Sequence, residues 1–115
     1  MKIRMIINGE PVPARLDDNP SARDFFARLP LTLTFEDYAS TEKIAYLEQP
    51  LDQQDAPAGY SASAGDITYY APWGNLALFY KGFGYAKGLI RLGNLEERAE
   101  LLATPGKLNI RIEAD

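Results

Sequence analysis

One short stretch of the 115-residue sequence gathers the side chains best suited to recognise a ligand. It reads APWGNLALFYKGFGYAKG and places Trp73, Phe79, Tyr80, Phe83 and Tyr85 among four glycines. Aromatic residues bury a large area at little entropic cost, and tyrosine and tryptophan also carry a hydrogen-bonding group. This composition is typical of an aromatic groove, but it also fits the core and turns of a small sheet protein.

Six side chains in and around this stretch are candidate ligand contacts. The turn and the glycine-rich loop would supply apolar contacts, and neighbouring polar groups would fix the orientation of the ligand. Arg91 stands between apolar residues in LIRLG, where an arginine either faces solvent or offers a planar pair of donors to a carbonyl or carboxylate. The candidates are Trp73, Phe83 and Tyr85 for apolar contact, and Tyr70, Asn75 and Arg91 for polar contact.

The sequence contains neither histidine nor cysteine, which removes most nucleophilic and metal-assisted catalysis. Without imidazole or thiol groups there is no thiolate nucleophile, no Ser-His pair and no common ligand set for zinc or iron. An acid–base step would need a carboxylate, lysine or tyrosine with a strongly shifted pKa. Glu36 and Asp37 are adjacent, but a solvated turn accounts for them better than a catalytic pair. We therefore predict no catalytic residue, no metal site and no cofactor.

The segment GFGYAKG matches a phosphate-binding glycine loop only in part. The dinucleotide fingerprint is G-x-G-x-x-G between a strand and a helix, whereas here the last interval is one residue longer and LIRLGNL follows, which is strand-like. Sixteen acidic and twelve scattered basic residues give a net charge of −4, which argues against nucleic acid or an anionic membrane as a partner. The apolar run Met5–Ile7 is too short for a signal peptide, so a cytoplasmic location is expected.

Apolar and polar residues alternate in about eight short segments, which predicts strands. Asn8-Gly9 is a strong hairpin signal, because a type I′ turn needs a positive φ at both central positions. Pro11 and Pro13 cannot donate to a ladder, so the second strand is expected at an edge or with a bulge. The predicted strands are Lys2–Ile7, Glu10–Leu16, Leu31–Phe35, Lys43–Leu47, Ile67–Ala71, Leu76–Tyr80, Gly88–Leu92 and Leu108–Glu113.

Two helices are predicted. In the first, Asn19 is the N-cap, Pro20 occupies the first helical position and Pro30 ends the helix. Its apolar stripe carries two phenylalanines, which we expect to insert into an open end of the sheet. The second helix is LEERAELLA, with Asn94 as its cap. The long connection from Glu48 to Gly65 is expected to be irregular but packed.

Short antiparallel strands in one small domain predict closure into a barrel, because closure removes exposed edges. The expected fold class is therefore all-β: a closed eight-stranded barrel capped by two short helices, with residues 1–115 forming a single domain. Strand alternation should direct two sets of side chains to opposite faces near the aromatic stretch. One set is Ile67, Tyr69, Leu76, Leu78 and Tyr80, and the other is Tyr70, Ala77 and Phe79.

Three segments of the sequence resemble the cyclophilin-like fold proteins of bacteria and archaea. They are EKIAYL, LDQQDAPAGYSASAGDITYYAPWGNLALFY and GFGYAKGLIRLGNL, and the most specific part is Gly65-Asp66 followed by Tyr69–Asn75. The resemblance runs over nearly the whole chain and implies a closed eight-stranded barrel with two helices. Members of this family mostly have no assigned activity. True cyclophilins isomerise prolyl peptide bonds on the outer barrel face, with an arginine that donates to the substrate.

That arginine has no counterpart here, since no arginine occurs between Arg28 and Arg91. Without such a donor, a barrier of roughly 18–20 kcal/mol would not be lowered efficiently. The sequence therefore favours a barrel that binds a small molecule or a short extended peptide at its aromatic groove without efficient catalysis. A divergent peptidyl-prolyl isomerase with Arg91 as the surrogate donor is the alternative. A third interpretation is that the groove joins the subunits of a homo-oligomer.

Overall fold

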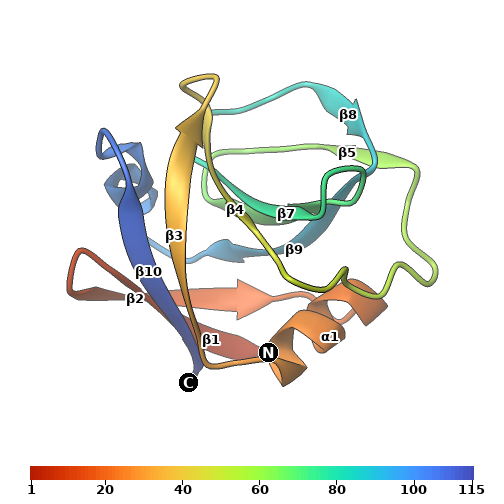
Figure 1. The fold of residues 1–115 in the computed structure, drawn as a ribbon, viewed down its shortest axis with the longest axis horizontal. Coiled ribbons are helices and arrows are strands. Elements are labelled where there is room, and N and C mark those ends of the chain that lie inside the picture. The colour runs from red at the N-terminus through yellow and green to blue at the C-terminus, as the bar shows by residue number, and fades with distance from the viewer.

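The computed structural model describes residues 1–115 and consists of a closed barrel with a small hairpin on its outside. Eight antiparallel strands close in the order β1-β10-β3-β4-β7-β6-β9-β2, and β5 pairs with β8 in a separate sheet (Figure 1). The all-β barrel predicted from the sequence is thus confirmed. The elements are β1 (Lys2–Ile7), β2 (Glu10–Leu16), α1 (Pro20–Ala27), β3 (Leu31–Tyr38), β4 (Glu42–Tyr46), β5 (Gly59–Ser61), β6 (Asp66–Tyr70), β7 (Asn75–Phe79), β8 (Tyr85–Lys87), β9 (Leu89–Leu95), the 3-10 helix η1 (Ala99–Ala103) and β10 (Leu108–Ala114).

The first hairpin forms as its turn residues predict. Asn8 and Gly9 have φ angles of 53° and 77°, the conformation that a type I′ turn requires. The prediction that β2 is an edge strand or bulged is wrong, because β2 lies between β1 and β9 without a register shift. Pro11 and Pro13 are nevertheless tolerated, since β9 pairs only with the later part of β2, Ala14 to Leu16.

Helix α1 starts at the predicted cap and places one phenylalanine in the main core. The side-chain oxygen of Asn19 accepts a hydrogen bond of 2.8 Å from the backbone N–H of Ala22, and Pro20 is the first helical residue. Phe25 is completely buried, whereas Phe26 is only partly buried and packs against the edge of the same cluster. The helix lies at the bottom of the view in Figure 1, away from the β5–β8 hairpin.

The second predicted helix is shorter than expected and of another type. It is the 3-10 helix η1, which covers only five residues, and its N-cap position is Arg98 in a left-handed conformation with φ of 59°. The prediction that Asn94 caps it is wrong, because Asn94 belongs to β9 and pairs with Asp66 and Arg15. Leu102 is the one fully buried residue of η1, so this segment covers a small part of the core.

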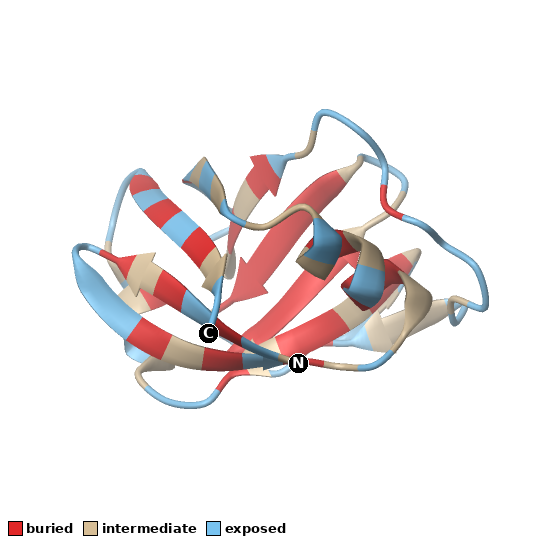
Figure 2. Ribbon diagram, turned by 90° about the horizontal axis from the view of Figure 1, so that it is seen from below, coloured by how far each residue is buried: buried red, intermediate tan, exposed pale blue.

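The apolar residues form two separate clusters. The main cluster of 22 buried residues fills the barrel, and it includes Tyr69, Leu76 and Leu78. A second cluster of four residues lies on the outer side, between the barrel and the β5–β8 hairpin; it comprises Ala62, Ala77, Phe79 and Leu89. Strands β6 and β7 are therefore buried on both faces, whereas β10 alternates between buried and exposed residues (Figure 2). The predicted separation of Tyr69 and Phe79 onto opposite faces is confirmed.

Closure of the barrel depends on a close approach of β9 to β2 at Gly93. A Cβ atom at Gly93 would lie 1.9 Å from the carbonyl oxygen of Arg15 and 2.8 Å from the Cα of Leu16. Next to this point, the register between β6 and β9 shifts between Ile67 and Thr68. Only glycine fits here, because any side chain would separate the two strands.

A buried lysine connects β4 to the loop before β10. Lys43 is completely buried, and its Nζ donates hydrogen bonds of 2.6 Å to the carbonyl oxygens of both Thr104 and Gly106. The same Nζ lies 2.9 Å from Oδ2 of Asp37 on β3. The lysine therefore ties three segments together at one end of the barrel. No helix of the protein has the length and apolar character needed to cross a membrane.

Candidate ligand-binding site

A cavity of about 200 Å³ opens on the outside of the barrel, between β4, β7 and the segment that carries β8. Eight of its ten lining residues are hydrophobic, and they come from strands as well as from the loops around them. The lining residues are Tyr38, Glu42, Ile44, Tyr70, Trp73, Asn75, Phe79, Phe83, Ala86 and Leu89. The cavity is bounded on its inner side by Phe79 and Leu89 of the second apolar cluster.

A tight turn between β6 and β7 presents Trp73 at the mouth of the cavity. The N–H groups of Trp73 and Gly74 donate to the carbonyl oxygen of Tyr70 at 3.2 and 2.9 Å, and Gly74 has a φ of 72° that favours glycine. Trp73 remains 50% exposed. Its ring contacts Tyr38 and Tyr70 at centroid distances of 5.6 and 5.4 Å, with interplanar angles of 85° and 78°. The Trp73 ring therefore packs edge-to-face against two tyrosine rings at the mouth of the cavity.

Phe83 covers the other side of the cavity. It lies in the loop before β8, where its N–H donates to the carbonyl oxygen of Ala62 at 2.9 Å. Its ring packs against Phe79 at a centroid distance of 6.1 Å, and it stays 48% exposed. Because residues 81–84 of this loop are all exposed, we expect it to move more easily than the barrel strands.

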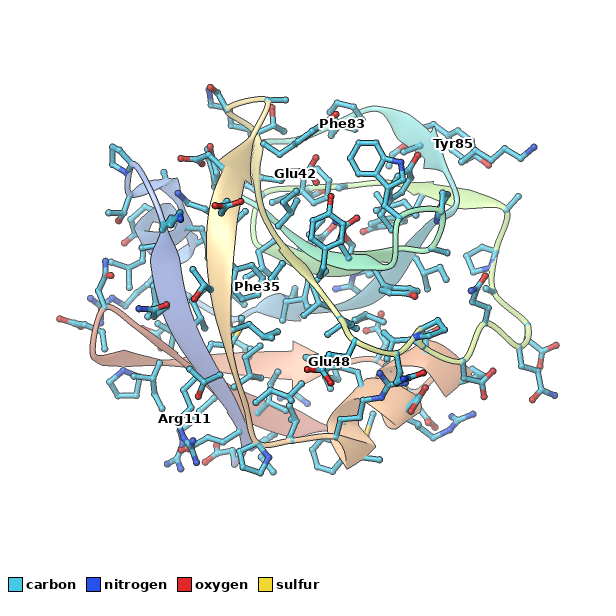
Figure 3. The ribbon with its side chains drawn as sticks, viewed as in Figure 1. Phe35, Glu42, Glu48, Phe83, Tyr85 and Arg111 are labelled. Atoms are coloured by element: carbon cyan, nitrogen blue, oxygen red, sulfur yellow. The ribbon has the colours of Figure 1, made fainter.

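Glu42 is the only charged residue that lines the cavity. It stands at the start of β4, paired with Tyr38 on one side and Phe79 on the other, and it makes no side-chain hydrogen bond or ion pair. Burial in this apolar surrounding raises the pKa of the Glu42 carboxyl to about 7. Figure 3 shows Glu42 near Phe83, whereas Glu48 lies beyond the other end of β4.

A second polar group in the cavity wall has no partner. Asn75 is 2% exposed, and its Nδ2 donates to the carbonyl oxygen of Leu76 at 3.1 Å. Its Oδ1 is the one buried side-chain polar atom of the protein without a hydrogen bond. Such an atom loses its hydration on folding at a cost of roughly 1–3 kcal/mol. A ligand that donates a hydrogen bond there would recover part of that cost.

Four of the six predicted contact residues meet at this cavity: Tyr70, Trp73, Asn75 and Phe83. Tyr85 does not line it, because alternation along β8 directs Ala86 inward and leaves Tyr85 63% exposed (Figure 3). The Tyr85 ring instead lies over Gly59, where a Cβ would come within 2.6 Å of it. Sequence reasoning missed Tyr38 and Glu42, which enter through the β3–β4 hairpin far from the aromatic stretch.

Arg91 lies in a different place, where it holds the segment before α1. Its Nη1 donates to both carboxylate oxygens of Asp17 at 2.9 and 2.8 Å, and its Nη2 donates to Oδ1 of Asn94 at 2.9 Å. Its Nε is 3.6 Å from Oδ1 of Asp66. Arg91 lines another, smaller cavity of about 140 Å³ with Tyr60. The arginine is thus already engaged by two carboxylates.

Asp66 and Tyr60 attach the β5–β8 hairpin to the barrel. The hydroxyl of Tyr60 donates to Oδ2 of Asp66 at 2.6 Å, and the N–H of Ser63 donates to the same oxygen at 2.8 Å. Burial first, and then this bond to a carboxylate, raise the pKa of Tyr60 to about 12. This interaction has a structural role, since it holds the β5–β8 hairpin, which covers one side of the cavity, against the barrel.

The prediction that Glu36 and Asp37 lie in a solvated turn is wrong, because both belong to β3 and pair with residues of β4. Tyr80 donates to Oδ1 of Asp37 at 2.7 Å, and this bond, followed by the contact with Lys43, holds the pKa of Asp37 below its ordinary range. Glu36 pairs with Lys107 at 3.4 Å on the surface. No three acidic side chains converge closely enough to hold a metal ion.

Comparisons with known proteins identify the fold. The model of a family described as the Cyclophilin-like family matches residues 5–113. The solution structure of the hypothetical protein AF2241 from Archaeoglobus fulgidus is similar, with a TM-score of 0.75 and 15% identity over 100% of this chain and 95% of that one. No curated protein sequence matches the chain.

Proposed function

The chain belongs to the Cyclophilin-like family, and we propose that it is a binding protein that holds a small molecule, or one side chain of a short extended peptide, in the cavity at Trp73. The main support is the unpartnered Oδ1 of Asn75, a buried acceptor in the wall of a mostly apolar cavity. A bound donor would supply the missing hydrogen bond.

The composition of the cavity favours recognition over catalysis. The aromatic rings offer apolar contact, and the only side-chain acid or base that lines the cavity, apart from tyrosines, is Glu42. A prolyl isomerase of the cyclophilin type would need a cationic donor beside the twisted amide. Arg91, the candidate for that role, is engaged by Asp17 and does not line the cavity. A divergent isomerase is therefore the second candidate, and it ranks behind binding.

The test of binding uses the single tryptophan as its reporter. Trp73 fluorescence is followed while a panel of metabolites and proline-containing tetrapeptides is titrated, and hits are measured by calorimetry. Phe83→Ala should weaken a hit by roughly tenfold, because it removes an aromatic wall. Tyr85→Ala is the control, since it removes a more exposed aromatic ring from the same segment that does not line the cavity. Equal effects of the two variants, or no hit in the panel, would contradict the proposal.

A coupled proline-isomerisation assay separates the two candidates. We expect no rate above background for the wild-type protein. A rate that is lost in Arg91→Ala would favour the enzyme and would show that the arginine leaves Asp17 during turnover.

A further inference from the structure

The cavity at Trp73 combines aromatic walls with a carboxylate that has no counterion. Tyr38, Tyr70 and Trp73 come from three different segments, yet their rings meet at near-perpendicular angles. Rings arranged in this way present electron-rich faces in more than one direction. A cation placed among such faces is attracted by their quadrupoles, and the attraction grows when water is displaced.

No cation of the protein neutralises Glu42. The nearest lysine in sequence, Lys43, directs its Nζ to Asp37 and to the carbonyl oxygens of Thr104 and Gly106. The other ionisable side chains around Glu42 are Tyr38 across the β3–β4 pair, Tyr70 in the cavity wall and Tyr80 after β7, and none of them is a cation. The carboxylate is thus half-buried among apolar rings with nothing positive beside it.

We propose that the ligand of this cavity is a small organic ammonium ion, held by Glu42, by the rings of Tyr38, Tyr70 and Trp73, and by Oδ1 of Asn75. This inference rests on the proposed binding function and specifies its ligand class. An organic ammonium ion satisfies the three features at once, because it is positive, it carries apolar carbon substituents, and it donates a hydrogen bond through an N–H group or, when the nitrogen is quaternary as in choline, through a hydroxyl.

The dimensions of the cavity agree with such a ligand. A cavity of roughly 150 Å³ accommodates a benzene ring, so the 200 Å³ available here is enough for a methylated ammonium head group. The mouth beside the half-exposed Trp73 and Phe83 leaves room for the rest of the molecule. A long aliphatic amine would have to extend through this opening.

The raised pKa of Glu42 makes the binding sensitive to pH. A proton and the ammonium ion compete for the same carboxylate, so the cation binds to the ionised form and releases a proton from the neutral one. With a pKa of about 7 in the free protein, affinity should fall by roughly tenfold between about pH 8 and about pH 6.

The decisive experiment compares choline with 3,3-dimethylbutan-1-ol, in which a neutral carbon replaces the ammonium nitrogen. Both are titrated against the wild-type protein in phosphate buffer, followed by Trp73 fluorescence and calorimetry. Choline is expected to bind at least about tenfold more tightly than its neutral isostere at about pH 8. Glu42→Gln should remove most of this preference and abolish the pH dependence, because the amide cannot ionise. Glu48→Gln is the same change at an exposed site outside the cavity, and it should alter neither the preference for choline nor the pH dependence of binding.

Each contrary result separates this inference from the function on which it rests. If the isostere binds as tightly as choline, the cavity binds ligands but does not select a cation. If choline does not bind while another panel compound does, the ligand class is again wrong and the binding function stands. If choline selectivity survives unchanged in Glu42→Gln, the carboxylate is not its source and the inference is overturned.

Discussion

Replacing Glu42 by glutamine is expected to stabilise the free protein at alkaline pH and to leave its stability nearly unchanged at acidic pH. Glutamine has the shape of the protonated acid, so the packing around Tyr38 and Phe79 should persist. The difference between the two proteins is the cost of ionising a carboxyl group in an apolar wall. That cost appears as the raised pKa of the folded state.

The size of the effect follows from the two pKa values. The rise from 4.5 to about 7 corresponds to about 3 kcal/mol if it is converted without allowance for solvent. Because Glu42 is only half-buried, solvent screens part of this cost, and we expect about 1–2 kcal/mol. For a domain of this size, such a change raises Tm by roughly 4–8 °C.

The direction of the pH dependence is fixed by the sign of the shift. Below about pH 4.5 the carboxyl is protonated in both folded and unfolded chains, so it carries no penalty. As the pH rises toward 7, the unfolded chain ionises first, and the wild-type protein loses stability relative to Glu42→Gln. Above about pH 7 the difference is complete and constant.

Urea unfolding of both proteins at about pH 4.5 and about pH 8 measures this difference, with far-ultraviolet circular dichroism as the probe. The remaining titrating groups are common to both proteins and cancel. Glu48→Gln should show no such pH-dependent gain, since its side chain is exposed. An equal stability difference at the two pH values, or a less stable Glu42→Gln protein at about pH 8, would refute the electrostatic reasoning.

Three further substitutions test the framework around the cavity. Lys43→Met should cost about 2–4 kcal/mol in urea unfolding, because two carbonyl oxygens and a carboxylate lose their buried donor; a change below about 0.5 kcal/mol would contradict this role. Gly93→Ala should cost more than about 3 kcal/mol or prevent folding, since its Cβ overlaps a backbone carbonyl; a stable, well-folded variant would show that β2 and β9 can move apart. Arg91→Ala should cost about 1–2 kcal/mol through the lost contact with Asp17, while leaving ligand titrations at Trp73 unchanged; a weakened ligand response would place the arginine at the cavity.

The barrel could be predicted from the sequence because several of its strands, such as β1 and β10, have one buried face, which leaves a period of two. Tyr69 and Tyr70 show the limit of this pattern: alternation separates them, but both faces of β6 are buried. The face of β6 that lies inside the barrel is determined by the way the sheet closes, which the alternation pattern does not reveal. The β5 and β8 strands were missed because each has only three residues, too few for any period to appear.

Four of the ten residues that line the cavity could be predicted from the sequence, because they lie close together in the aromatic stretch. Glu42 and Tyr38 could not, since strand pairing between β3 and β4 brings them to the cavity from another part of the sequence. The position of Arg91 outside this cavity could not be predicted for a similar reason. Its partner Asp17 lies 74 positions away and cannot be read from local context.

The division of the apolar residues into two clusters lets the barrel and its outer cover change separately. Twenty-two buried residues maintain the cylinder, while a set of four anchors the hairpin above Phe79. Apolar side chains of the β5–β8 hairpin pack against the cluster of four residues and not against the main core. Substitutions in the hairpin should therefore leave the barrel folded. Residues at the rim of the cavity can therefore change without loss of the barrel.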